Sequence, residues 1–274
     1  MFFDAWTIDT DMLKKALFSQ RDLLDYALVC KNVIYHYQSF FKKDEILLLG
    51  DKNPGYTIYT QKLLNIFPEA KFIFINRDYR DNYISLKKVD FELPFISMVT
   101  YKWKHFFKVA LKDGKKNPDR FYFINYEKLV AAPQKEYANI CGFLGIEPNN
   151  EVFNFHEKEA EIKSIYSEEV VNKYHSSLLK PISNMNVGRW QEELSESQIR
   201  IADRVAGDYA HLAGYEQKYK KPGTKDFLKS LPGVSAGMLL YTTTAVVNSF
   251  PYKLRQLILS KGPFLLGKLF GKKK

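Results

Sequence analysis

Three short, largely apolar segments alternate with helical patterns along this chain, and that alternation limits the fold more than any other feature. The segments cover residues 46–50, 71–76 and 120–125. A strand that is apolar along most of its length is buried on both faces, which is typical of a parallel sheet covered by helices. We therefore predict an α/β fold with three α/β/α layers around a central parallel sheet.

The segments before, between and after the predicted strands have the spacing and the end signals of helices. Ser195 followed by Gln198 forms a capping pattern, and Pro133 and Gly145 are typical of a helix start and end. Residues 151–185 are charged and irregular, which predicts a loop-rich region. The predicted helices cover residues 11–43, 54–67, the turn after residue 76 to about 88, 94–112 closed by Asp113-Gly114, 133–145, and 195–212 before Gly214.

The chain changes character after residue 220, which predicts a domain over residues 1–220 and a basic, apolar tail over 221–274. The tail has no charge from Leu231 to Tyr252, yet residues 224–274 carry nine Lys or Arg against one acid, Asp226. A span needs about 20 mainly apolar residues, and the prolines and glycines here argue against one. One interpretation is an amphipathic segment at an anionic membrane surface. The other is a helix pair that packs on the domain.

Charge and cysteine content restrict the class of partner. The formal net charge of +10 favours polyanionic partners, such as anionic lipid or a phosphate- or sulfate-bearing small molecule. No aromatic-basic RNA motif or recognition-helix pattern accompanies that charge, so we do not expect a nucleic-acid partner. Cys30 and Cys141 belong to no Cys/His cluster, which argues against a metal site. A reducing compartment fits best, so the predicted location is cytoplasmic, peripheral at the inner face of the membrane.

The second apolar segment leads directly into a pattern suited to phosphate. Arg77 follows the strand at its carboxyl end, where open α/β sheets bind ligands. A helix starts at once, so its first backbone N–H groups and the positive end of its dipole are available to an anion. An arginine fork and a serine hydroxyl, Ser85, can hold a phosphate through charge-assisted hydrogen bonds. The alternative is a surface ion pair of Arg77 with Asp78 or Asp81.

The run Arg77-Asp78-Tyr79-Arg80-Asp81 followed by Ser85 resembles the 3′-phosphate-binding segment of the sulfotransferases that use 3′-phosphoadenylyl sulfate (PAPS). Tyr79 stands where that family often has proline. The resemblance is to bacterial and protein-tyrosine members and covers roughly residues 45–216. Further matching segments follow the family's order: Gly50-Asp51-Lys52-Asn53-Pro54; Tyr126-Glu127 with Leu129, Pro133 and Phe143-Leu144-Gly145; Val187-Gly188-Arg189-Trp190; and Leu212-Ala213-Gly214-Tyr215.

The resemblance implies a P-loop-kinase-like sulfotransferase fold, PAPS or adenosine 3′,5′-bisphosphate as the bound nucleotide, and no metal. Arg77 and Ser85 match the residues that hold the 3′-phosphate, and Lys52 matches a lysine that contacts the transferring sulfuryl group. Tyr126 would meet the adenine or ribose, and Arg189 would close over the nucleotide. The alternatives are a solvated turn lysine for Lys52, a core tyrosine for Tyr126, and a surface cation–π pair of Arg189 with Trp190.

One departure from the family stands out. The family begins with a strand and a turn rich in glycine, serine and threonine that holds the 5′-phosphosulfate, whereas residues 1–45 contain no glycine. Two interpretations follow. The chain is an N-terminally incomplete sulfotransferase that acts on a carbohydrate, lipid-linked or small hydroxyl (or amine) acceptor. Alternatively, it is a non-catalytic remnant that binds nucleotide and works through its tail at a membrane.

Overall fold

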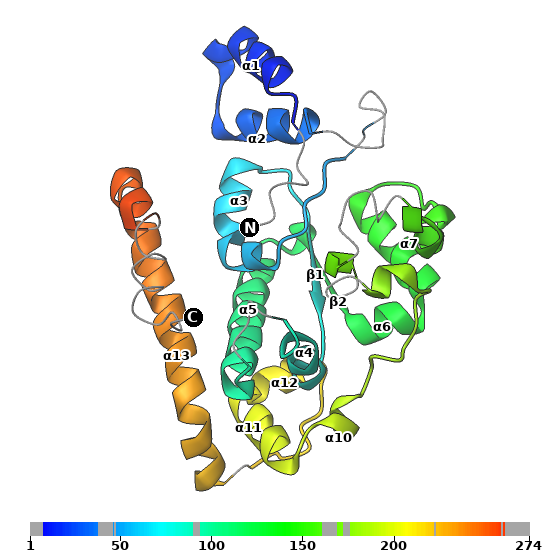
Figure 1. Ribbon diagram of the computed structural model, residues 1–274, viewed down its shortest axis with the longest axis vertical. Helices are drawn as coiled ribbons and strands as arrows, with labels where there is room; N and C mark the ends of the chain where they lie inside the picture. The colour runs from blue at the N-terminus through cyan, green and yellow to red at the C-terminus, as the bar shows by residue number, and fades with distance from the viewer. Residues whose placement is uncertain are drawn as a thin grey trace. The chain divides into compact units, whose positions relative to one another are not determined.

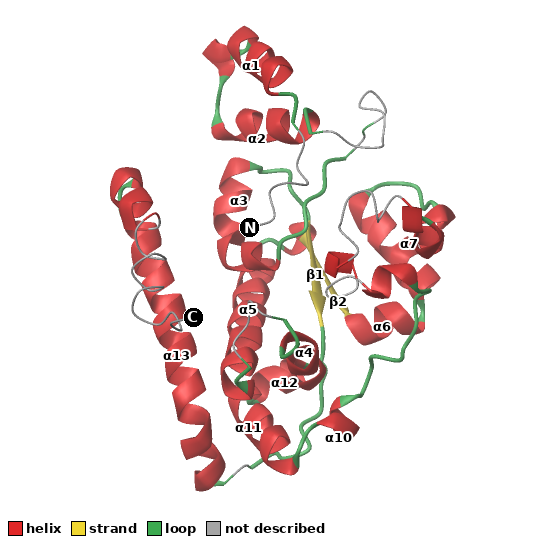
Figure 2. Cartoon of the chain, viewed as in Figure 1, coloured by secondary structure: helices red, strands yellow, loops and turns green. Residues whose placement is uncertain are grey.

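The computed structural model describes residues 8–37, 46, 48–89, 94–160, 169–171, 176–221, 223–258 and 260. Most of these residues are helical, as Figure 2 shows, and the contacts divide the chain into two compact units. The first unit consists of Met1–Arg77 and Phe106–Val187, and the second of Asp78–His105 and Gly188–Lys274.

The helices and strands divide between the units, and α5 (Ile96–Lys116) contributes its first half to the second unit and its second half to the first. The first unit also contains α1 (Thr10–Ser19), η1 (Arg21–Leu23), α2 (Tyr26–Tyr35), η3 (Pro54–Tyr59), α3 (Thr60–Ile66), β1 (Phe72–Asn76), η4 (Pro118–Arg120), β2 (Phe121–Asn125), α6 (Tyr126–Ala131), α7 (Pro133–Leu144), η5 (Asn150–Glu157) and η6 (Ser176–Leu179). The second contains α4 (Tyr79–Leu86), α10 (Trp190–Glu193), α11 (Glu196–Ala206), α12 (Asp208–Leu212) and α13 (Thr224–Ser249).

The first unit is built around β1 and β2, which lie side by side and parallel in Figure 1, in register from Phe72 opposite Phe121 to Asn76 opposite Asn125. Successive strand residues point to opposite faces of the sheet. On one face the Phe74 ring lies 6.2 Å from the Phe107 ring of α5, and on the other the Tyr122 ring lies 5.4 Å from the Phe143 ring of α7. Helices therefore cover both faces, and the predicted three-layer α/β class is confirmed.

The long helix predicted over residues 11–43 is wrong, because the described part of it forms two helices. The Asp9 carboxylate accepts hydrogen bonds from the backbone of Asp11 and Met12 and starts α1. A second N-cap starts α2, where the Asp25 carboxylate accepts a 2.7 Å hydrogen bond from the Leu28 backbone N–H. Asp9 satisfies backbone N–H groups that lack an internal acceptor at any helix start, whereas Asp25 satisfies one that a continuous helix would bond internally. Residues 38–45 lie outside the described part.

The strand predicted over residues 46–50 is also absent from its described residues, Ile46 and 48–50. Leu48 and Leu49 are exposed, and the sheet of the described residues consists of β1 and β2. A strand exists only where a neighbour accepts its backbone hydrogen bonds. The apolar run supplied strand propensity, but no described strand pairs with it.

Two glycines change the predicted helix boundaries, Gly114 at a predicted helix end and Gly207 inside a predicted helix. Gly114 lies inside α5, where a Cβ atom would stand 2.6 Å from the Phe123 ring, so glycine permits the close approach of helix and sheet. Gly207, with φ +56°, divides the predicted helix 195–212 into α11 and α12. The capping box of Ser195 with Gln198 and the left-handed end of α7 at Gly145 are confirmed.

Within the second unit, α13 packs against α5. A Cβ atom on Gly233 would stand 2.0 Å from Ser97 Oγ, and one on Gly237 would stand 2.6 Å from the Tyr101 ring. Ser230 is buried on the same side of the helix. Residues 224–249 are therefore helical and packed on the first half of α5 within the second unit, as the packing interpretation of the tail required. The domain boundary at residue 220 stays a prediction.

Candidate functional site

Arg77 and Tyr126 each come directly after one of the paired parallel strands. The Arg77 guanidinium carbon lies 4.7 Å from the centre of the Tyr126 ring, and its Nη2 donates a 2.6 Å hydrogen bond to the Asn186 carbonyl oxygen. Both side chains are half-buried. The first unit thus holds an arginine at the carboxyl edge of its sheet, where α/β proteins bind ligands, oriented by an aromatic face and a backbone carbonyl.

Asn76, the last residue of β1, adds a polar group beside Arg77 in the chain. Its side chain is buried, and in the described part of the chain its amide nitrogen has no hydrogen-bond acceptor. A buried donor without an acceptor is uncommon in proteins and is often explained by a ligand or an ion.

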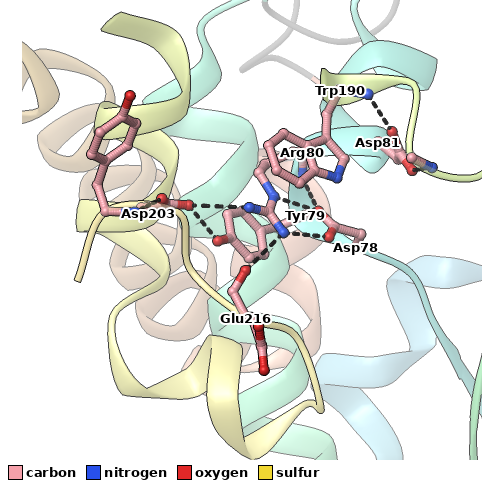
Figure 3. A network of polar contacts seen from close by, with 9 residues as sticks. Asp78, Tyr79, Arg80, Asp81, Trp190, Asp203 and Glu216 are labelled. Carbon is pink, nitrogen blue, oxygen red and sulfur yellow. Dashed lines mark hydrogen bonds and ion pairs between the residues drawn. The ribbon is translucent and has the colours of Figure 1, made fainter. Parts of the chain in front are cut away.

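The turn after Arg77 is held by a buried ion pair, shown in Figure 3. Arg80 donates two hydrogen bonds to the carboxylate of Asp78, at 2.9 and 2.7 Å, and a third to the Glu216 carbonyl oxygen. The Asp78 carboxylate also accepts from the backbone N–H of Arg80, so it caps α4. The sequence predicted that the first backbone N–H groups of α4 are available to a phosphate. This needs correction for Arg80 N, because the Asp78 carboxylate already accepts its hydrogen bond.

A second buried carboxylate, Asp203 of α11, closes the network (Figure 3). It accepts from the Tyr79 hydroxyl at 2.5 Å and from the Tyr219 backbone N–H at 2.7 Å, and it lies 3.7 Å from Arg80 Nη1. Burial raises the pKa of Asp203 to about 6, although the Tyr79 hydrogen bond and the Arg80 charge act in the opposite direction. Burial likewise raises the pKa of the Tyr79 hydroxyl.

Residues 188–190 are joined to the first turn of α4. The Asp81 carboxylate accepts from Gly188 N at 2.6 Å and from Trp190 N at 2.9 Å. The Trp190 ring lies over Arg80, with 3.6 Å from the guanidinium carbon to the ring centre. The cation–π contact of this motif therefore joins Trp190 to Arg80, which corrects the alternative that paired it with Arg189.

Arg189 makes a different contact, an ion pair with Glu193 one turn later in the chain. Glu193 also lies 3.6 Å from Lys87, at the end of α4. Desolvation opposes ionisation of Glu193, but the hydrogen bond and charge of Arg189 and the charge of Lys87 outweigh it and lower the pKa of this carboxyl. Arg189 is half-buried and carries its charge beside the end of α4.

Ser85 and Lys52 are both exposed, Ser85 on α4 and Lys52 in the turn before η3. Next to Lys52, Asp51 is hydrogen-bonded to the Tyr56 hydroxyl, and this bond together with burial raises the pKa of Tyr56 to about 12. By unit, Arg77, Tyr126 and Lys52 belong to the first, and Ser85 and Arg189 to the second. The described residues contain no group of three metal-ligating side chains.

The sequence placed Arg80 only within a motif, considered Asp81 and Trp190 as contact partners of Arg77 and Arg189, and gave no sign of Asp203. The alternation of Asp and Arg at residues 77–81 signalled ion pairing and suggested Arg77 as a member, whereas the structure pairs Asp78 with Arg80. No local pattern links Asp81 to residues 188–190, because more than 100 positions separate them in the chain.

Comparison with known proteins finds one matching family and several similar sequences. The model of the sulfotransferase family matches residues 3–150. A putative protein-tyrosine sulfotransferase of Caenorhabditis briggsae is 23% identical over 182 residues, which cover 64% of this chain and 62% of that protein. An omega-hydroxy-beta-dihydromenaquinone-9 sulfotransferase of Mycobacterium bovis is 27% identical over 133 residues, 43% of this chain and 34% of that one.

The sulfotransferase domain of the Synechococcus PCC 7002 olefin synthase, a solved structure, is 23% identical with a TM-score of 0.47; the match covers 67% of this chain and 63% of that one. The chain spans less than two thirds of the length of each of these three proteins. The family model, which covers more than half of the chain, decides the assignment. This chain belongs to the sulfotransferase family.

Proposed function

We propose that this chain binds PAPS and transfers its sulfuryl group to a hydroxyl or amine acceptor. Arg77 and Ser85 hold the 3′-phosphate, Tyr126 meets the adenine or ribose, and Arg189 closes over the nucleotide. The observation that carries the proposal is Arg77 at the carboxyl edge of β1, oriented by the Tyr126 ring and the Asn186 carbonyl. A buried amide donor one residue earlier, Asn76, suits a ligand rich in acceptor oxygens.

The chemistry is an in-line displacement at sulfur. The acceptor oxygen or nitrogen forms a bond to sulfur, the bond from sulfur to the bridging oxygen of PAPS breaks, and the acceptor proton passes to a base. Adenosine 3′,5′-bisphosphate leaves. Negative charge on the bridging and equatorial oxygens requires cationic stabilisation, for which we propose Lys52.

The names of the relatives favour a hydroxyl acceptor over an amine. One is named as a putative sulfotransferase of protein tyrosine and the other as a sulfotransferase of omega-hydroxy-beta-dihydromenaquinone-9, and both named substrates carry hydroxyl groups. We propose a hydroxyl on a small, lipid-linked or carbohydrate molecule as the acceptor of this chain.

Nucleotide binding can be tested without knowledge of the acceptor. We expect adenosine 3′,5′-bisphosphate to bind more tightly than adenosine 5′-phosphate, and Arg77→Ala to remove the difference. A hydrogen bond to a charged group contributes about 1.5–3 kcal/mol, which corresponds to about ten- to hundredfold in affinity. Isothermal titration calorimetry measures both nucleotides.

The matched control is Arg120→Ala, since Arg120 precedes β2, at the opposite end of the strands from Arg77, and pairs with Glu69. This variant should keep the preference for the 3′-phosphate. Equal affinity of the unmodified chain for the two nucleotides would refute the assignment. Release of adenosine 3′,5′-bisphosphate from PAPS with an acceptor present separates a transferase from a chain that only binds nucleotide.

A second candidate, a nucleotide-binding partner at a membrane, is favoured by the surface of α13. The side away from α5 exposes apolar residues, with Leu239 69% and Met238 52% accessible. By length and composition α13 could cross a membrane, but Gly233 and Gly237 already contact α5. We therefore propose contact with an anionic membrane surface at the inner face of the membrane. Other exposed members of this apolar side are Leu228, Leu231 and Val246.

A further inference from the structure

Asp81 joins two segments that are far apart in the chain of the second unit. Its side chain is buried, and its two carboxylate oxygens each accept one backbone N–H, from Gly188 and from Trp190. Hydrogen bonds to an ionised acceptor are stronger than those between neutral groups. One carboxylate thus holds both neighbours of Arg189.

The backbone around Arg189 is set from other directions as well. Gly188 has φ +76°, a left-handed conformation that favours glycine, and it turns the chain into α10. The Trp190 ring lies on the Arg80 guanidinium, which Asp78 holds through two hydrogen bonds. Figure 3 shows Asp81 and Trp190 meeting on one side of this network. Residues 188–190 are therefore held by buried charged side chains, Arg80 and Asp81, in the first turn of α4.

The side chain of Arg189 is linked, through Glu193, to the carboxyl end of α4. Glu193 pairs with Arg189 and also with Lys87, which directly follows α4. Asp81 fixes the backbone of Arg189 from the start of α4, and Lys87 fixes its ionic partner from the end. An exposed ion pair alone contributes little to a fixed orientation, so the buried backbone contacts of Asp81 dominate.

We propose that Asp81 is a positioning residue for the nucleotide-binding arginine, Arg189. The Asp81 carboxylate accepts hydrogen bonds from the backbone N–H groups of Gly188 and Trp190, and these bonds fix the backbone that carries the Arg189 guanidinium. The segment is therefore ordered before nucleotide binds, and it loses less conformational entropy on binding. Asp81 itself touches no nucleotide and acts through Arg189. This inference rests on the proposed function, in which Arg189 contacts the nucleotide.

A double-mutant cycle tests the inference. We expect Asp81→Asn and Arg189→Ala each to weaken adenosine 3′,5′-bisphosphate binding about tenfold. The double variant should bind no more weakly than Arg189→Ala alone, because Asp81 acts only through Arg189. The control is Asp113→Asn, another buried carboxylate, which accepts from the Thr60 hydroxyl in the first unit. It should leave the affinity unchanged.

A structural readout accompanies the titrations. Amide hydrogen exchange of residues 188–190 should accelerate in Asp81→Asn and remain slow in Asp113→Asn. If Asp81→Asn does not fold, Gly188→Ala disturbs the same segment through its positive φ, and the new methyl group would make only an ordinary van der Waals contact, 3.8 Å from Gln191 Nε2. It should give the same non-additivity with Arg189→Ala.

The two hypotheses fail in different ways. If Arg189→Ala leaves nucleotide affinity unchanged, the role of Arg189 in the proposed function is wrong, and the inference falls with it. If Arg189→Ala weakens binding while Asp81→Asn does not, or if the two losses add, the proposed function survives and the positioning role is refuted. Unchanged hydrogen exchange at residues 188–190 in Asp81→Asn also refutes it.

Discussion

At the scale of single residues, the second unit is distinguished by ionisable groups that are buried together. Asp203 is fully buried between the Tyr79 hydroxyl, the Tyr219 backbone and the Arg80 guanidinium. Replacing a buried ion pair by apolar residues is often neutral, whereas removing one partner is strongly destabilising. The network therefore fixes the geometry of the turn after Arg77 more than it adds stability.

The titration of Asp203 gives a prediction with a definite sign. Its pKa is about 6 in the folded chain and about 4 when unfolded, so the folded protein takes up this proton first as the pH falls. The contribution of Asp203 to the free energy of unfolding thus rises between pH 7 and pH 4 and is lost as pH rises through 6.

Asp203→Asn removes that titration. We expect the free energy of unfolding of the unmodified chain, relative to this variant, to increase by about 2–3 kcal/mol from neutral to mildly acidic pH. Urea denaturation of both proteins at the two pH values measures the change. A difference that stays constant or decreases on acidification would show that burial does not control this carboxyl.

At the scale of elements, glycines decide how closely helices approach their neighbours. Gly233 of α13 faces Ser97 and Met98 of α5 at distances that leave no room for a methyl group. Gly142 of α7 has open space at the same position, with no atom within 4 Å. The two residues share a helical conformation and differ only in their surroundings.

The same substitution at these two glycines should have opposite effects. Gly233→Ala is expected to destabilise the protein by about 1–3 kcal/mol, because the new methyl group forces α13 away from α5. Gly142→Ala should stabilise it by about 0.5–1 kcal/mol through helix propensity alone. Denaturant unfolding measures both. Equal effects of the two variants would mean that α13 does not pack on α5 as described.

At the scale of the whole molecule, the basic, apolar carboxyl-terminal region raises the question of membrane contact. The exposed side of α13 is apolar, and Lys225, Lys229, Lys253 and Arg255 flank the uncharged stretch. Deleting residues 224–274 would also remove the packing of α13 on α5. Substitutions confined to the exposed side leave that packing intact and isolate the surface contact.

We expect salt-sensitive binding to vesicles of phosphatidylserine and phosphatidylcholine, reduced by Met238→Gln with Leu239→Gln. Each basic residue near such a surface contributes about 1 kcal/mol, which salt screens. Leu212→Gln is the matched control, since Leu212 is 57% accessible on α12 of the same unit. Vesicle sedimentation measures the bound fraction. Loss of binding in the control as well, or no binding by the unmodified chain, would contradict the membrane proposal.

The sequence by itself determined the features that depend on near neighbours. The parallel strands β1 and β2, the helix ends at Ser195 and Gly145, and the position of Arg77 after β1 were all predictable. Period, caps and turn residues act within a few positions, so their effect can be read locally.

Only the tertiary structure decided which distant groups meet. It left Ile46 and residues 48–50, the described part of the apolar run, outside the sheet that β1 and β2 form, and it gave Gly114 a packing role inside α5. It also joined Asp81 to the segment that carries Arg189 and enclosed Asp203 beside Arg80. These outcomes depend on pairing, close approach and burial, which arise between segments far apart in the chain and which no local pattern contains.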